Sequence, residues 1–383
     1  MKRCNPLPQR PANRRPAPAA QAGNPLATVL WGIAAALEVV IVVLGILLLV
    51  QYRQQMANYT PRQRGEVYLR QENYRQAQSC FAQALREDGS DPDLYLLHGL
   101  ASAQVQDNGA LRGDVTALEE LWPDRKPLLE QWQKTLQDGV LLARTGADGD
   151  TTRYLYDLLG RCIEEEITTG GETHRTRCTY GSDGRMSGRI WYQDAGGKRE
   201  LCRESYTYNA EGWLTRVSYI GADGSDQGTL SLLYNTDGNL TRIRGTGEDF
   251  DGTLTFAYDA GGNCTTCSRT GTLPGMLQQM PAAERTYTYQ SGASGCGFRY
   301  DPREGLVEPR FVTGVTSQVG QGTDSWTCTV DADGRCLSCT GGDEDIRYDY
   351  DEQGRLLTEN HLSDSGSRTV EYTYGSLAEA LAE

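Results

Sequence analysis

The chain has 383 residues and a formal net charge of −14 at pH 7, a length that suffices for two or three domains. After residue 53 it holds 50 of its 51 acidic residues but 31 of its 37 basic ones, so nucleic acid is not expected as a partner of this part. The three histidines make the chain poor in the most common acid–base and metal-binding side chain.

The N-terminal segments are a tail and an apolar run. Residues 1–25 are basic and proline-rich without apolar periodicity, which predicts disorder. Residues 26–52 contain an uninterrupted run in which Glu38 is the one charge, and its length matches the roughly 20 residues that cross a bilayer. We therefore predict a single-pass transmembrane helix at the cell membrane. A cleaved signal peptide is the alternative, disfavoured because the run is too long and lacks a small-residue cleavage site.

The orientation of this helix is not decided by the basic residues beside it, because both flanks carry them. A basic tail with no signal ahead of it is hard to export, whereas a long C-terminal part follows regardless of its charge. We expect a cytoplasmic N-terminus and extracytoplasmic C-terminal domains. Glu38 has two interpretations: a polar contact between two copies, which predicts a homo-oligomer, or a protonated side chain tolerated by an apolar helix.

Residues 56–145 are predicted to be helical, because aromatic and small residues recur at spacings typical of packed helix pairs. The first set comprises Gly65, Tyr68, Tyr74, Ala77, Phe81, Ala84 and Leu85; the second begins 34 residues later with Tyr95, Gly99, Val115, Leu118 and Pro123. The pattern resembles the tetratricopeptide repeat. That resemblance implies a short α-helical domain, capped by an amphipathic helix from Pro127 to Leu142. It would serve as a peptide-binding or self-association groove, or as a spacer.

A turn-forming stretch, residues 146–152, leads into a phrase that recurs through residues 150–376. The phrase is an aromatic residue, any residue, Tyr, Asp or Asn, two residues, Gly, Arg or Asn, and an apolar residue. Its glycines are Gly160, Gly184, Gly212, Gly238, Gly262, Gly334 and Gly354. Their spacing is 20–28 residues except for one gap of 72, which we interpret as about three periods of a repeat architecture.

Each copy of the phrase predicts a β-hairpin. Two aromatic residues two apart, such as Tyr154 and Tyr156, project from one face of a strand. Asp157 followed by Gly160 supplies a tight turn, after which the apolar residue begins the return strand. Successive copies therefore predict an antiparallel meander in which the tyrosines of neighbouring copies stack on one another.

Tyr156-Asp157 with Gly160-Arg161, and Tyr350-Asp351 with Gly354-Arg355, resemble the YD-repeat or rearrangement-hotspot family of bacterial cell-surface and toxin-carrying proteins. In that family long arrays coil into a shell that can enclose a C-terminal toxin. Residues 377–383 are a short tail here, so no toxin is expected. The predicted fold class is multidomain: a single transmembrane α-helix, a short tetratricopeptide-like helical domain, and an antiparallel all-β array.

Two Cys-x-x-Cys pairs, Cys264 with Cys267 and Cys336 with Cys339, have the spacing of zinc half-sites. Disulfides are an alternative. Free buried thiols are a third, because Cys264 and Cys336 lie two residues after the glycine of the phrase, where other copies have leucine, and a buried thiol behaves as a small hydrophobe. We favour the third.

Asp331-Ala-Asp-Gly334 and Asp223-Gly-Ser-Asp226 are similar to calcium loops, but hairpin turns explain both. His98 is expected to serve packing or to lie at the surface of the second helical repeat, while His174 and His361 lie near loops and have no evident partner. No phosphate-binding loop or nucleophile motif is found. We therefore predict no catalytic, cofactor-binding or metal-binding residues, and no enzyme.

The sequence favours a membrane-anchored, cell-surface, non-catalytic module that binds or adheres to protein or cell-wall glycan. The tryptophans Trp191, Trp213 and Trp326 are candidate platforms for sugar rings or peptide. The alternative is a structural scaffold or stalk that assembles through the membrane helix and the helical repeats. A further alternative is a relative of toxin-carrying YD-repeat proteins that lacks the toxin.

Overall fold

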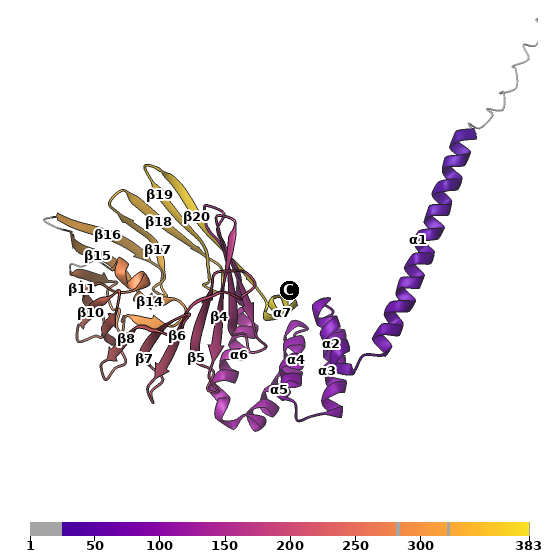
Figure 1. Ribbon diagram of the computed structural model, residues 1–383, viewed down its shortest axis with the longest axis horizontal. Coiled ribbons are helices and arrows are strands. Elements are labelled where there is room, and N and C mark those ends of the chain that lie inside the picture. Colours follow the sequence, from indigo (N-terminus) through magenta and orange to yellow (C-terminus); the bar gives the residue numbers. More distant parts are fainter. Residues whose placement is uncertain (1–24, 281–283, 320–321, 383) are drawn as a thin grey trace, which may run out of the picture. The chain divides into compact units, whose positions relative to one another are not determined.

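The computed structural model describes residues 25–280, 284–319 and 322–382, in two units, Met1–Thr60 and Pro61–Glu383 (Figure 1). The helices are α1 (Pro25–Ala57), α2 (Pro61–Arg70), α3 (Tyr74–Glu87), α4 (Pro92–Gln104), α5 (Asn108–Leu121), α6 (Lys126–Asp138) and α7 (Leu377–Ala382), with the 3-10 helices η1 (Pro123–Arg125) and η2 (Gly275–Gln279).

The first ten strands are β1 (Val140–Thr145), β2 (Thr151–Tyr156), β3 (Cys162–Thr169), β4 (Glu172–Tyr180), β5 (Met186–Tyr192), β6 (Glu200–Tyr208), β7 (Leu214–Gly221), β8 (Asp226–Tyr234), β9 (Leu240–Gly247) and β10 (Asp251–Tyr258). The remaining strands are β11 (Cys264–Gly271), β12 (Arg285–Tyr289), β13 (Arg299–Asp301), β14 (Gly305–Val307), β15 (Val312–Val319), β16 (Gly322–Val330), β17 (Cys336–Gly341), β18 (Glu344–Tyr350), β19 (Leu356–Ser363) and β20 (Gly366–Gly375).

The N-terminal unit contains α1, one helix that is long and apolar enough to cross a membrane. Residues 1–24 of the predicted tail and the side chain of Glu38 lie outside the described residues, so the interpretations of both stay predictions.

The other unit is built on a closed antiparallel β-barrel of 18 strands, called the ring below. Neighbours in sequence pair throughout, except that β12 pairs with β15, while β13 and β14 form a separate hairpin. β1 closes the ring because it pairs with β2 on one side and with β20 on the other. Every ring strand therefore has two partners, and the ring leaves no unpaired sheet edge.

The predicted fold class is wrong in two respects. The β segment is a closed barrel rather than the predicted meander of hairpins, and residues 140–145, assigned above to the helical segment, form its closing strand β1. The helices are also not a separate tetratricopeptide-like domain: Phe81 and Trp132, both fully buried, belong to one core cluster with Tyr156 and Cys162 of the ring. Residues 377–382, expected as a tail, form α7, and Leu377 lies in the same core.

The gap of 72 residues in the phrase also differs from the prediction of three periods. Between Gly262 and Gly334 the ring has four strands, β11, β12, β15 and β16, which make two hairpin periods. The rest of this stretch, as far as it is described, forms two inserts, residues 272–280 and 290–311, which contain η2 and the β13–β14 hairpin.

The turn of each phrase forms as the sequence predicts. Asp157 Oδ1 accepts hydrogen bonds from the amides of Leu159 and Arg161, both at 3.0 Å. Gly160 has φ +74°, a conformation that costs little only for glycine. The Arg161 side chain returns to the other carboxylate oxygen of Asp157 at 2.8 Å, so aspartate and arginine fix the two sides of one turn.

A β-bulge follows each turn and decides which side chains face inward. In the first copy Leu155 pairs with Glu164 but Tyr156 pairs with Cys162, so Ile163 is the extra residue. The residues two and five positions after each glycine consequently share one face. Those at the first position are Cys162, Met186, Leu214, Leu240, Cys264, Cys336 and Leu356. Those at the second are Glu165, Arg189, Val217, Ile243, Cys267, Cys339 and Glu359.

Tyrosine hydroxyls connect each copy to the one before it. Tyr180 Oη donates to the Cys162 carbonyl at 2.6 Å, and Tyr234 Oη donates to the Leu214 carbonyl at 2.8 Å. The same bond joins Tyr156 to Leu141, Tyr208 to Met186, Tyr258 to Leu240, Tyr289 to Cys264 and Tyr350 to Cys336. We call these seven bonds the tyrosine ladder.

Over several of the ladder rings lies the residue after the phrase glycine, rather than a second tyrosine as predicted. The Arg161 guanidinium lies 4.6 Å from the centre of the Tyr180 ring, within the range of a cation–π contact. Trp213 takes the place of arginine in the third copy, and its ring centre lies 5.4 Å from that of Tyr234.

Candidate functional site

The second insert carries a hairpin, β13–β14, that packs against the inner face of the ring. Phe298 contacts Phe256 of β10, with ring centres 4.7 Å apart, and Arg303 lies 5.3 Å from the ring centre of Tyr154 in β2. One short hairpin can reach strands from β2 to β10 only on the concave side of the sheet. The hairpin therefore lies on the inner side of that half of the barrel (Figure 1).

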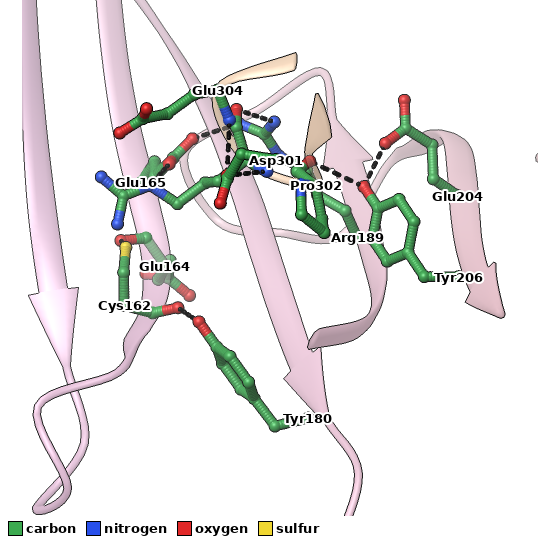
Figure 2. Close-up of polar contacts among 11 residues, drawn as sticks. Cys162, Glu164, Glu165, Tyr180, Arg189, Glu204, Tyr206, Asp301, Pro302 and Glu304 are labelled. Atoms are coloured by element: carbon green, nitrogen blue, oxygen red, sulfur yellow. Dashed lines mark hydrogen bonds and ion pairs between the residues drawn. The ribbon is translucent and has the colours of Figure 1, made fainter. Parts of the chain in front are cut away.

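Buried ion pairs hold this hairpin in place. Glu165 of β3 pairs with Arg189 of β5, and its other oxygen lies 3.4 Å from Arg303 Nε of the hairpin. Arg189 Nη1 also donates to the Arg303 carbonyl at 3.2 Å (Figure 2). Glu165 is 4% exposed and Arg189 8% exposed, so each charge depends on the other for compensation. We call Glu165, Arg189 and Arg303 the clamp.

A second polar contact anchors the same hairpin next to the clamp. Tyr206 Oη donates to the Glu204 carboxylate and also lies 3.1 Å from the Pro302 carbonyl oxygen (Figure 2). Burial raises the pKa of Glu204 above its ordinary value, and burial followed by the neighbouring Glu204 charge raises the pKa of Tyr206. The hairpin is thus fastened to β3, β5 and β6 by groups that are costly to leave without partners.

The inner face of β15–β18 borders a cavity of about 660 Å³ instead of a plug. This volume falls within the roughly 300–1,000 Å³ typical of small-molecule sites. Its lining combines apolar and aromatic side chains with charged ones: Arg285, Glu308, Pro309, Arg310, Val312, Val315, Asp324, Trp326, Cys328, Val330, Gly334, Arg335, Cys336, Cys339, Ile346, Tyr348 and Tyr350. We call this space the cavity and take it as the candidate binding site.

Trp326 is the largest aromatic side chain in the cavity wall. A Cβ atom placed on Gly341 would lie 2.5 Å from Trp326 Cδ2, so the indole packs directly on the glycine backbone of the adjacent strand. Because one side of the ring rests on Gly341 and the residue also lines the cavity, Trp326 offers a flat surface to a bound ring.

Three cysteines lie together in the same wall. Cys328 of β16 and Cys339 of β17 are directly paired across the sheet and form a disulfide. Cys336 Sγ, which is free, lies 3.4 Å from Cys339 Sγ. The two Cys-x-x-Cys pairs therefore do not assemble into one zinc site. Cys264 and Cys267 are free buried thiols elsewhere in the ring, as favoured above, whereas the same prediction is wrong for Cys339, which is bonded to Cys328.

A polar second cavity of about 610 Å³ shares Asp324 and Trp326 with the first. His361 lies in its lining with Nδ1 2.7 Å from Glu344 and Nε2 2.5 Å from Glu359, so this histidine does have partners, contrary to the sequence analysis. Trp326 therefore borders both cavities, and the lining of each also contains charged residues.

The remaining candidate residues lie outside the cavity. His98 is buried in α4 with Nδ1 2.8 Å from Asp114 of α5, and His174 lies on β4. Asp223 accepts the Ser225 amide at 2.9 Å, a turn contact that needs no cation. Asp331 accepts the Arg335 amide in the same way, also at 2.9 Å.

Two of the candidate tryptophans are occupied by intramolecular contacts. Trp191 packs against the Arg189 guanidinium, which lies 4.3 Å from the ring centre, and Trp213 covers Tyr234. Trp326 is the candidate platform that the structure brings to the cavity.

The clamp was not predicted from the sequence. Its signal is the residue five positions after the phrase glycine, where Glu165 and Arg189 replace the apolar Val217 and Ile243 of other copies. A comparison of the copies at this position would have identified three charged residues, Glu165, Arg189 and Glu359, where the other copies have Val, Ile or Cys.

No protein-family model matches this chain, and no curated protein matches it. Neither the YD-repeat resemblance nor the tetratricopeptide resemblance is therefore confirmed, although the β structure is repetitive.

Solved structures with a related arrangement include a porin-like protein from Bacteroides uniformis, 17% identical over 61% of this chain and 96% of its own, with a TM-score of 0.34. The TcdB2-TccC3-TEV structure is 14% identical over 62% of this chain and 15% of its own, with a TM-score of 0.25. The Photorhabdus luminescens Tc holotoxin pore gives 14% identity, 59% and 14% coverage, and a TM-score of 0.25. The match thus spans about one seventh of the toxin chains. At these TM-scores the likenesses carry no argument about function.

Proposed function

We propose that this chain is a membrane-anchored, non-catalytic binding module that holds a polar, ring-bearing ligand in the open half of its barrel. The observation that carries the proposal is the lining of the cavity of about 660 Å³, where Trp326 lies in the wall together with charged side chains such as Arg285 and Asp324. A purely structural scaffold does not require an aromatic side chain such as Trp326 to face a cavity of this size.

A glycan segment is the ligand class that fits this lining best. Sugar rings pack on flat aromatic surfaces such as the exposed side of Trp326, and their hydroxyls bond carboxylates and guanidinium groups. Asp324 and Arg285 supply such groups in the cavity, and Glu344 and Arg368 supply them in the second cavity.

Binding is tested by titrating the full-length chain in detergent with soluble oligosaccharides released from cell-wall glycan, followed by calorimetry. We expect saturable binding that Trp326→Ala weakens at least tenfold, because one aromatic platform is lost. Trp213→Phe, which alters a tryptophan outside the cavity, should leave the affinity within twofold. Saturable binding of a surface protein that Trp326→Ala also abolishes would favour a protein ligand instead. Wild-type affinity in Trp326→Ala would refute the proposal.

Helix α1 and the disulfide both support the proposed membrane placement. Disulfides persist mainly in oxidising, extracytoplasmic compartments, so the Cys328–Cys339 bond supports an extracytoplasmic barrel with the N-terminus in the cytoplasm. Protease treatment of intact cells, with antibodies to each end of the chain, tests this orientation. We expect loss of the C-terminal epitope without lysis, and its survival would reverse the orientation.

Self-association through α1 is a separate part of the proposal. If Glu38 contacts a second copy within the bilayer, Glu38→Leu should reduce the oligomer mass measured in detergent by light scattering. An unchanged mass would leave α1 as an anchor alone.

A further inference from the structure

The three cysteines of the cavity wall have a geometry that ordinary core packing does not require. The sulfur atoms of Cys328, Cys336 and Cys339 all lie within 4.8 Å of one another. Elsewhere in the ring the same two positions after the glycine hold pairs such as Leu214 with Val217, or Cys264 with Cys267. The feature that distinguishes this copy is the third sulfur, supplied by the neighbouring strand β16.

We propose that Cys328, Cys336 and Cys339, once reduced, form a three-thiolate site for a thiophilic divalent cation of the Zn²⁺ class. With metal–sulfur distances of about 2.3 Å, a tetrahedral ion holds its sulfur ligands roughly 3.8 Å apart. The Cys336–Cys339 separation of 3.4 Å is close to that value. The three cysteines lie on two paired strands, so their sulfur atoms need to move little when the disulfide is reduced and an ion binds.

The surroundings of the three sulfurs also suit an ion. All three cysteines line the cavity, so an ion can enter, and a water molecule can take the fourth coordination position. Three thiolates and one divalent cation carry a net charge of −1. Arg285 and Arg335 line the same cavity, where they pair with Glu308 at 3.5 Å and with Asp331 at 2.6 Å.

Reduction of the disulfide precedes binding of the ion. A phosphine reductant takes up the oxygen of one water molecule and becomes the phosphine oxide, while the disulfide gains two electrons and two protons and yields two thiols. The ion then displaces one proton from each of the three thiols and binds the three sulfurs. At the extracytoplasmic face a dithiol donor would supply the same two electrons and two protons and would itself become a disulfide.

This inference is independent of the proposed glycan function, because it concerns the reduced wall of the cavity rather than its ligand. The structure contains the oxidised state, in which the Cys328–Cys339 bond uses two of the three sulfurs. Oxidation and ion binding therefore exclude one another, and the oxidised protein serves as an internal control.

The experiment uses the full-length chain in detergent, treated with a phosphine under anaerobic conditions and titrated with Cd²⁺ and then Zn²⁺. The ultraviolet thiolate-to-cadmium band reports sulfur ligation, and competition with a chromophoric chelator gives the affinity for Zn²⁺. We expect one ion for each chain and no band without reductant. Two variants at one position guard against misfolding: Cys336→Ser, and Cys336→Leu, which installs the residue that Leu214 and Leu356 provide at this point of other copies.

Both variants should lower the affinity at least tenfold, whereas Cys267→Ser, in the pair without a third sulfur, should change it less than twofold. An unchanged ion affinity in Cys336→Leu would overturn the proposal. A loss of ion binding in Cys267→Ser that the Cys336 variants do not show would overturn it too. Absence of the cadmium band in the reduced wild-type chain would overturn it as well. None of these results bears on whether the oxidised chain binds glycan.

Discussion

Tyr180 Oη lies 2.6 Å from the carbonyl oxygen of Cys162, which belongs to the preceding copy of the phrase. Tyr180, at the end of β4, thereby bonds the first residue of β3, 18 residues earlier. At that residue a bulge interrupts the regular backbone hydrogen bonds between β2 and β3. The bond satisfies a backbone acceptor at an irregular point of the sheet and fixes the spacing of successive hairpins.

Removal of one ladder hydroxyl should destabilise the barrel modestly. Tyr234→Phe deletes the donor to the Leu214 carbonyl and retains the ring against Trp213. We expect the free energy of unfolding, measured by denaturant titration of the full-length chain, to fall by about 0.5–1.5 kcal/mol. Tyr192→Phe, which alters a tyrosine outside the ladder, is the control and should change it less. An equal or larger effect in the control would show that the ladder contributes nothing specific.

The clamp predicts a much larger effect for a single substitution. Glu165→Leu leaves Arg189 buried without its carboxylate, and breaking a buried pair in this way costs about 3–5 kcal/mol. The double variant Glu165→Leu with Arg189→Met should recover part of that loss, because the uncompensated Arg189 charge is gone while Arg303, whose Nε lies 3.4 Å from Glu165, still lacks its carboxylate.

A surface pair provides the comparison for the clamp. Arg203 and Glu200 are 46% and 24% exposed at their side chains, so Arg203→Met should cost less than about 1 kcal/mol. Limited proteolysis should also cut residues 299–307 faster in Glu165→Leu than in the wild type. Equal cutting, with a loss below 1 kcal/mol, would mean that the clamp does not hold the hairpin.

The positions within each copy explain which features of the fold could be predicted. The turn depends on residues close in sequence, so Asp157 and Gly160 identify it. Closure depends on β1 and β20, which are more than 200 residues apart. The bulge defeats simple alternation as well: a period of two from Cys162 places Glu164 inward, whereas the extra Ile163 turns Glu165 inward instead. A pattern that assumes regular alternation along the strands therefore could not predict the clamp.

The same alignment of copies predicts that Cys267 is replaceable. Val217 and Ile243 occupy its position in other copies, and its own side chain is 2% exposed. Cys267→Val should change the free energy of unfolding by less than about 1.5 kcal/mol, since a hydrophobic exchange of similar volume is tolerated. Cys267→Asp is the contrasting variant and should prevent folding or cost several kcal/mol, because it buries an unpaired charge. A large loss in Cys267→Val would assign the thiol a role beyond packing.

Alkaline pH should unfold the barrel through its ladder tyrosines. Burial raises the pKa of Tyr208 and of Tyr234 from the ordinary value of 10.0 to about 12. Between these values the unfolded chain loses its phenolic protons while the folded chain retains them. The folded state therefore binds more protons, and its stability falls as the pH rises from 10 toward 12.

Denaturant titrations of the full-length chain at pH 8, 10 and 11, read by far-ultraviolet circular dichroism, measure this effect. The absorbance of tyrosinate should rise together with the loss of β signal, because the ladder hydroxyls ionise on unfolding. Tyr208→Phe with Tyr234→Phe should be less stable than the wild type at pH 8 but should lose less stability between pH 10 and 11, since two of the titrating groups are gone. A parallel decline in both proteins would place the alkaline sensitivity outside the ladder, in other groups such as the cysteine thiols.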